Sequence, residues 1–207
     1  MKGITVISHP LVQHYLTRLR DRQIGPQDFR RILQHITVLL VFEATASLVT
    51  RPVPVNTPLA KARGARLKHD VLLVPILRAG LGMLEPALKL IPDARAGFIG
   101  AKRDAETLAP SVYHESLPAD LRRHDVIVLD PMLATGGSTV AAIDLLKERH
   151  AKSLRSLHLV AAPEGLRHLR TSHPEVQLFT AAIDRRLNRK GYIVPGLCDA
   201  GDRLFGV

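Results

Sequence analysis

Cysteine, tryptophan and long apolar runs are scarce in this chain of 207 residues. The single cysteine, Cys198, excludes an internal disulfide and favours a reducing compartment. Residues 1–10 hold no apolar segment of signal-peptide length, and no apolar run approaches the ~18 residues of a membrane span. Aromatic residues make up only 4%, so the stacking surface of many single-strand nucleic-acid binders is poorly supplied. We therefore expect a cytoplasmic protein that does not span a membrane and is not built to bind nucleic acid.

Positive charge, in contrast, is in excess. The formal net charge is +10 and the pI is about 10.3, which implies affinity for anions such as phosphorylated metabolites, nucleotides or RNA. Charge alone does not choose among these partners. With 46% hydrophobic residues, the chain can bury a sizeable core, and its length fits a single domain over residues 1–207.

Hydrophobic periodicity predicts alternating strands and helices, and hence an α/β fold with a mainly parallel sheet flanked by helices. We expect strands at 71–77, 96–100, 126–129, 154–160 and 176–179, and helices at 11–20, 26–47, 81–90, 139–147 and 163–169. The prolines of 51–58 indicate an extended or edge segment. Residues 102–124 have few core-type side chains and resemble a long mobile arm or hairpin. The tail, 181–207, is rich in glycine and charge and does not fit another crossover unit.

A buried strand is expected at 126–129, and Asp130 follows directly at its carboxyl end. Open α/β sheets bind ligands at this edge, where one carboxylate can accept hydrogen bonds from two ribose hydroxyls. Residues 134–138 are small, so backbone N–H groups can approach a phosphate, and a helix beginning near Ser138 adds its positive end. The segment predicts a sugar-phosphate site. An ordinary turn with Ser138 as N-cap would explain the glycines and the serine but not Asp130-Pro131.

The segment 74–83 repeats this arrangement, with Arg78 in the turn between strand and helix. A guanidinium at the carboxyl end of a strand can hold a phosphate through two parallel N–H bonds. Taken alone, the pattern is equally compatible with an arginine that bonds to loop carbonyl groups. Beside the first motif, it indicates a second anion site.

The histidines do not indicate a metal site. No pair among His150, His158, His168 and His173 has the spacing of a helical zinc site with a carboxylate between. We expect these residues at the surface or at helix ends. Cys198 could in principle act as a nucleophile, but the sequence places no histidine or other general base beside it.

Seven blocks of the chain together resemble the uracil phosphoribosyltransferases. They run in the family's order nearly from end to end: residues 9–11, 42–45, 75–83, 103–110, 130–138, 161–165 and 191–206. The resemblance implies a type I phosphoribosyltransferase core with N-terminal helices and a base-binding C-terminal hood at 181–207. It also implies a pyrimidine-salvage reaction in which the 5-phosphoribosyl group of phosphoribosyl diphosphate (PRPP) passes to uracil, giving UMP and diphosphate.

Carried over onto this sequence, the resemblance assigns three groups of residues. The catalytic residues would be Arg78, Arg103 and Asp130. PRPP would be bound by Arg78, Arg103, Asp130, Pro131, Met132, Leu133, Ala134, Thr135, Gly136, Gly137, Ser138 and Asp199. Uracil would lie against Ile193, Cys198, Asp199 and Ala200, largely through backbone groups. Mg²⁺ would bind mainly through PRPP, without a protein metal cage. GTP is implied as an effector without assigned residues, and a homo-oligomer, by default a dimer, is expected to cover the apolar N-terminal helix.

Cys198 departs from the resemblance, because glycine is expected at this place in the wall of the base slot. A positive φ there would strain the cysteine, and the thiol would narrow the slot in any case. A phosphoribosyltransferase for another base is therefore one alternative. A PRPP-binding RNA regulator of pyrimidine genes on the same fold is another, for which the net charge would be the RNA footprint. Such a regulator is expected to carry two adjacent acidic residues in its PRPP loop, whereas here Pro131 follows Asp130.

Overall fold

The computed structural model describes residues 3–103 and 110–207. Within them, nine strands form one sheet, in which all neighbours run parallel except the antiparallel last pair. Its order is β1 (Ile4–Val6), β11 (Gln177–Ile183), β10 (Ser153–Ala161), β8 (His124–Leu129), β4 (Asp70–Leu77), β6 (Phe98–Arg103) and β7 (Pro110–Ser116). Two short strands, β5 (Arg95–Ala96) and β9 (Met132–Leu133), pair with β4 and β10. The predicted α/β fold with a mainly parallel sheet is confirmed.

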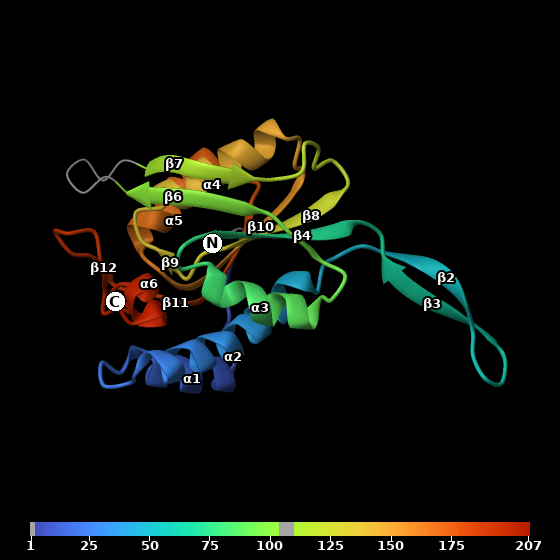
Figure 1. The fold of residues 1–207 in the computed structure, drawn as a ribbon, viewed down its shortest axis with the longest axis horizontal. Helices are drawn as coiled ribbons and strands as arrows, with labels where there is room; N and C mark the ends of the chain where they lie inside the picture. The colour runs from blue at the N-terminus through green and yellow to red at the C-terminus, as the bar shows by residue number, and fades with distance from the viewer. Residues whose placement is uncertain (1–2, 104–109) are drawn as a thin grey trace.

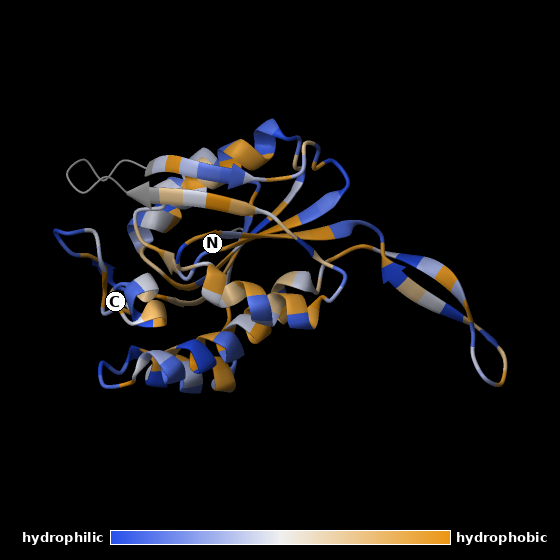
Figure 2. Ribbon diagram, in the orientation of Figure 1, coloured by the Kyte–Doolittle hydropathy of each residue, from blue (hydrophilic) through white to orange (hydrophobic). Residues whose placement is uncertain are grey.

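Helices cover both faces of this sheet (Figure 1). One face carries α1 (Pro10–Arg20), α2 (Pro26–Thr45) and α3 (Leu81–Leu90), and the other carries α4 (Gly137–Glu148) and α5 (Pro163–Ser172). Hydrophobic residues run along the central strands between the two layers (Figure 2). Because both faces of β4 and β8 are covered, these strands are nearly continuous apolar runs. Strand β10 is also buried along its length, but it includes the polar residues Arg155, Ser156 and His158.

The predicted apolar stripe of α2 accounts for the packing of this helix. Phe29, Ile32, Leu33, Ile36 and Leu40 recur at intervals of three and four, and each is at most 1% exposed. Pro26 begins the helix, where a missing backbone N–H costs nothing. The chain itself therefore buries the stripe that we expected a second subunit to cover.

The strands differ from the expectations in two places. The segment expected as one strand at 96–100 is divided into β5 and β6 at Gly97, whose N–H donates to the Leu73 carbonyl. The proline-rich segment is indeed extended, as β2 (Thr50–Asn56), but it pairs with β3 (Lys61–Leu67), which was not predicted. In β3 the only half-buried residue is Gly64, so the strand carries no apolar alternation to detect. The β2–β3 hairpin projects away from the sheet (Figure 1).

The expected arm at 102–124 is shorter than predicted. Its first part is the β6–β7 hairpin, whose residues 104–109 lie outside the described residues. From Leu117 onward the chain returns to the body of the protein, because Leu121 is fully buried in the core and β8 begins at His124.

The tail is not a crossover unit, as predicted. It forms the antiparallel pair β12 (Arg186–Leu187) and β13 (Ile193–Val194), followed by α6 (Ala200–Phe205). The expectation that His158 lies at the surface or a helix end is wrong, because this residue is fully buried in β10. Among the described residues, no helix is both long and apolar enough for a membrane span.

Candidate active site

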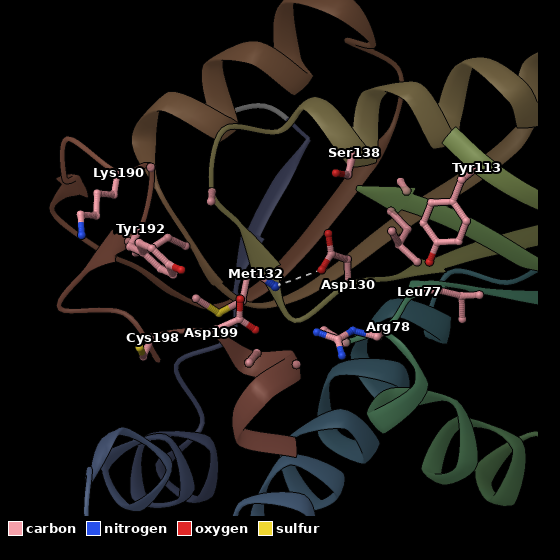
Figure 3. Close-up of a pocket in the computed structure, with 18 residues that line it drawn as sticks. Leu77, Arg78, Tyr113, Asp130, Met132, Ser138, Lys190, Tyr192, Cys198 and Asp199 are labelled. Atoms are coloured by element: carbon pink, nitrogen blue, oxygen red, sulfur yellow. Dashed lines mark hydrogen bonds between the residues drawn. The ribbon is translucent and has the colours of Figure 1, made fainter. Parts of the chain in front are cut away.

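A cavity of about 640 Å³ lies at the carboxyl ends of β4 and β8, beside the C-terminal hood, residues 181–207 (Figure 3). Nine residues of the predicted site line it: Arg78, Asp130, Met132, Ala134, Ser138, Ile193, Cys198, Asp199 and Ala200. Five others do not line it: Pro131, Leu133, Thr135, Gly136 and Gly137. These five belong to the same 130–138 loop, and the Leu133 side chain is buried in the core. The structure therefore brings three separate segments of the sequence to one cavity.

Asp130 is held where β8 ends by bonds to the neighbouring strand β10. Its backbone N–H donates to the Leu157 carbonyl at 3.2 Å, and its carbonyl oxygen lies 2.7 Å from His158 Nδ1. The next carbonyl, that of Pro131, accepts from the N–H groups of Leu159 and Val160 at 3.0 and 3.1 Å. The carboxylate projects into the cavity and accepts from the Met132 N–H at 3.3 Å (Figure 3).

The 130–138 loop passes into α4 through Gly136, which has φ +83° and is the N-cap of the helix. Glycine adopts this left-handed conformation without steric cost. Ser138 lies inside the helix and lines the cavity, so the alternative of a Ser138 N-cap is wrong. Gly165 of α5 lies directly under the loop, since a Cβ there would come within 2.5 Å of the Ala134 carbonyl oxygen. The positive end of α4 thus faces the cavity beside small residues.

Arg78 follows β4 in the second predicted turn, after the cis peptide bond Leu77–Arg78. Its side chain is 61% exposed, lines the cavity and forms an ion pair with Asp202 at 3.3 Å. Gly80 allows this turn to approach β8, because a Cβ there would lie 2.4 Å from the Leu129 carbonyl oxygen. Arg103 ends β6, and its side chain lies outside the described part of the chain.

The hood is attached to the N-terminal helices by charged side chains. Arg20 of α1 forms an ion pair with Asp184 at 2.7 Å and donates to the Gly196 carbonyl. Arg203 of α6 donates to the Leu19 and Leu197 carbonyls at 2.9 and 3.3 Å. Asp202 of α6 forms an ion pair with Arg78.

Asp199 and Cys198 form the part of the hood that lines the cavity. Asp199 is the N-cap of α6 and accepts from the Asp202 N–H at 3.0 Å. Cys198 has φ +62°, so the condition under which we expected strain at this position is met. Its side chain is exposed to the cavity.

Of the cavity-lining residues that were not predicted, three carry polar side chains: Tyr113, Lys190 and Tyr192. Tyr113 reaches it from β7 by packing over Gly100, where a Cβ would lie 2.5 Å from the ring. In the β6–β7 register Gly100 pairs with His114, and Tyr113 falls at the register shift beside it, which the sequence does not show. Tyr192 lies in the 191–206 block, which was singled out for other residues, and Lys190 directly precedes that block.

Burial and hydrogen bonding shift the pKa of two side chains near this site. Burial lowers the pKa of His158 from 6.5 to about 4, so this imidazole is neutral at physiological pH. The Glu164 carboxylate accepts from the Leu187 N–H at 3.1 Å, which lowers the pKa of Glu164. This bond connects α5 to β12 of the hood.

The chain matches the family model for uracil phosphoribosyltransferase over residues 6–207. It is 53% identical over 204 residues to the uracil phosphoribosyltransferase of Dictyoglomus thermophilum, covering 98% of this chain and 99% of the relative. The solved structure of the AQ2163 protein from Aquifex aeolicus superposes with a TM-score of 0.94 at 40% identity, covering 99% of this chain and 98% of that one.

A more distant structure shares the fold alone. Adenine phosphoribosyl transferase from Trypanosoma brucei, solved with AMP, pyrophosphate and ribose-5-phosphate, has a TM-score of 0.59 at 11% identity, covering 92% of this chain and 88% of that one. Family membership rests on the match to the family model over residues 6–207 and on the 53% identity. The chain belongs to the uracil phosphoribosyltransferase family.

Proposed function

We propose that the protein transfers the 5-phosphoribosyl group of PRPP to uracil, giving UMP and diphosphate. One observation carries the proposal beyond family membership: the Asp130 loop, the Arg78 turn and the hood meet at a single cavity. A sugar carrying phosphates at both ends needs two anion sites flanking a hydroxyl-binding group. A base acceptor needs a third wall close to the anomeric carbon.

The 130–138 loop would hold the ribose 5-phosphate end of PRPP. The Asp130 carboxylate is suited to accept hydrogen bonds from the two ribose hydroxyls, and the small residues 134–138 leave backbone N–H groups accessible to the phosphate. Pro131 and Leu133 would act by shaping the loop rather than by touching the ligand.

Arg78 would hold the diphosphate, together with Arg103. Breaking the bond from the anomeric carbon to diphosphate gives the sugar oxocarbenium character and leaves negative charge on the departing oxygens. A guanidinium fixed at a strand end stabilises that charge without first having to move into place. The present ion pair of Arg78 with Asp202 is more than 40% exposed on both sides, so diphosphate can displace the carboxylate at low cost.

The uracil slot would be formed by Ile193, Cys198, Asp199 and Ala200, which line the cavity from the C-terminal segment. Their backbone N–H and C=O groups can read the edge of a pyrimidine. Uracil N1 must lose a proton during the transfer, and no side chain is assigned as its base.

Mg²⁺ is proposed as a companion of PRPP. No group of three or more His, Cys, Asp or Glu side chains suited to a metal occurs within residues 3–103 and 110–207. The cavity does offer carboxylate oxygens from Asp130 and Asp199, which suits an ion held mainly by substrate phosphates. When bound, Mg²⁺ would neutralise part of the charge on the leaving diphosphate.

We also propose a cytoplasmic homo-oligomer in which GTP acts as an effector, as the resemblance implies. Exposed apolar side chains support the oligomer: Phe42 is 64% exposed at the end of α2, and Leu59 is 98% exposed at the tip of the β2–β3 hairpin. No residues are assigned to GTP.

The reaction is tested by mixing the protein with PRPP and Mg²⁺, offering each free base in turn, and identifying the nucleotide by mass. UMP should form with uracil, with release of one diphosphate per UMP. A nucleotide formed faster from another base would contradict the proposed substrate. If no base gives a nucleotide and a structured RNA binds at physiological salt, the regulator alternative would replace the enzyme.

A further inference from the structure

His158 is a buried titratable side chain that the proposed reaction does not use. It lies near the end of β10, directly beneath the turn that carries Asp130, and is 0% exposed. Its Nδ1 is 2.7 Å from the Asp130 carbonyl oxygen, and its Nε2 is 2.6 Å from Ser156 Oγ. Ser156 is also fully buried. A buried polar pair in the central part of a sheet is costly unless each of its groups is satisfied.

The chemistry of the two partners decides the tautomer of the ring. A carbonyl oxygen only accepts hydrogen bonds, so Nδ1 must carry the proton and donate it to Asp130. In a neutral ring Nε2 then accepts, and the Ser156 hydroxyl donates to it. Burial lowers the pKa of His158 to about 4 and so maintains this neutral form. Ser156 thus donates to His158, and His158 donates to the backbone carbonyl of Asp130.

The Asp130 carboxylate is carried by a turn whose backbone is held at its carbonyl. The carbonyl oxygen accepts from His158 Nδ1 at 2.7 Å, at the short end of the range for an N–H···O bond. The carboxylate of the same residue accepts from the Met132 N–H at 3.3 Å and from Thr139 Oγ1 at 3.5 Å. The bond to His158 therefore restrains the peptide from which the carboxylate projects.

We propose that His158, oriented by Ser156, is a positioning residue that fixes the Asp130 peptide and thereby aims the carboxylate that takes the ribose of PRPP. The inference rests on the proposed function. His158 touches no substrate, so its loss should weaken PRPP binding while leaving the uracil wall of the cavity unchanged.

Substitutions that copy one ring nitrogen at a time test this role. The amide nitrogen of asparagine occupies the place of Nδ1 relative to Cβ, whereas the amide nitrogen of glutamine occupies the place of Nε2. His158→Asn therefore keeps a donor for the Asp130 carbonyl, and His158→Gln does not keep it at the same reach. His158→Val removes both groups and retains a β-branched residue suited to a strand.

Thr180→Val is the matched control. Thr180 is the β11 partner of His158 in the sheet register, is equally buried, and donates to the Ala182 carbonyl at 3.0 Å rather than to Asp130. Its replacement also removes a buried polar group from the sheet, so it should change stability without changing PRPP binding.

The measurements are KM for PRPP and for uracil, the Kd of PRPP with Mg²⁺ by calorimetry, and the urea midpoint. His158→Val and His158→Gln should raise KM and Kd for PRPP about tenfold, the scale of one buried hydrogen bond. His158→Asn should stay within about threefold of the parent, and Thr180→Val should match it. KM for uracil should be unchanged in all four.

The tautomer gives an independent readout by ¹⁵N NMR of the histidine rings. The parent should show the signals of one buried neutral ring with its proton on Nδ1 and none on Nε2. These signals should be absent from His158→Val. Equal PRPP affinity of the parent, His158→Val and His158→Gln, in a protein that makes UMP, would overturn the role of His158 alone. A parent protein that neither binds PRPP nor makes UMP would overturn the proposed function and this inference with it.

Discussion

Cys198 is the residue at which the chain departs most from what its site requires. With φ +62°, its Cβ lies near the following carbonyl oxygen, an arrangement that costs an L-residue about 1–2 kcal/mol. Its side chain also lines the wall assigned to uracil. From the sequence we predicted that the thiol narrows this slot, and that the cysteine is strained if residue 198 has a positive φ. Only the backbone of residue 198 could show that the condition holds.

Replacing Cys198 separates the strain from the bulk of the thiol. Cys198→Gly should lower KM for uracil about threefold or more and leave KM for PRPP unchanged, because both the strain and the bulk are removed. Cys198→Ala retains the strained Cβ and removes only the sulfur, so its KM for uracil should fall between the other two. Steady-state kinetics with each substrate varied in turn give the answer. Identical uracil kinetics in the three proteins would refute a role for this position in base binding.

At the scale of elements, the close approach of α5 to the 130–138 loop determines where the phosphate end of the site lies. Gly165 is in the first turn of α5, and a Cβ there would meet the Ala134 and Leu133 carbonyl oxygens at 2.5 and 2.8 Å. Backbone atoms cannot rotate away as a flexible side chain can. Any residue larger than glycine must therefore move the loop or the helix.

Gly165→Ala should raise KM for PRPP more than tenfold and lower the unfolding free energy by about 1–3 kcal/mol, the usual cost of overpacking. Gly25→Ala is the matched control, because a Cβ at Gly25 meets no atom within 4 Å among the described residues. Because Gly25 is the N-cap of α2, where alanine is disfavoured, that control should cost roughly 0.5–1 kcal/mol of stability and leave KM for PRPP unchanged. Urea unfolding and PRPP kinetics measure both effects. Normal PRPP kinetics in Gly165→Ala would show that the loop does not depend on this contact.

Elements with strong periodicity were predictable from the sequence, and elements held by distant partners were not. The range of α3, 81–90, was predicted correctly, because apolar spacing and length are local properties. Strand β3 and the contribution of β7 to the cavity were not predicted, because both depend on contacts between segments. Strand β3 pairs with β2, and the Tyr113 ring packs on Gly100. Gly136, rather than Ser138, is the N-cap of α4. It has a left-handed φ and packs on a distant residue, since a Cβ there would lie 3.0 Å from the Gly165 carbonyl oxygen.

At the scale of the whole molecule, the neutral buried state of His158 makes the stability of the chain depend on pH. Its pKa is 6.5 when exposed and about 4 in the folded protein, so between these values the unfolded chain binds more protons. Folding stability must therefore fall as the pH is lowered through this window. At 1.36 kcal/mol per pKa unit, the loss attributable to His158 reaches about 3 kcal/mol once the pH is near 4.

Urea unfolding of the parent and of His158→Val at pH 7.5 and at pH 4.5 isolates this contribution, because the other titrating groups are common to both. The parent should lose about 2–3 kcal/mol more than the variant on acidification. Equal losses in the two proteins would mean that His158 is not held in its neutral form by burial.

The sequence predicted that two anion-binding turns lie at neighbouring strand ends, because the carboxyl ends of parallel strands share one edge. It could not predict what holds those turns in place. His158 lies within the strand predicted at 154–160, between Leu157 and Leu159, but the sequence does not show which groups its ring contacts. Its partner, the Asp130 carbonyl, is 28 residues away.

The most direct test of the account is a crystal structure of the protein with PRPP and Mg²⁺. The account predicts the 5-phosphate against the backbone of residues 134–138, the ribose hydroxyls at Asp130 and the diphosphate beside Arg78, with the Arg78–Asp202 ion pair broken. A separate cavity is lined by Arg51 and Arg66 at the base of the β2–β3 hairpin. PRPP bound in that cavity, or with its diphosphate away from Arg78, would contradict the account.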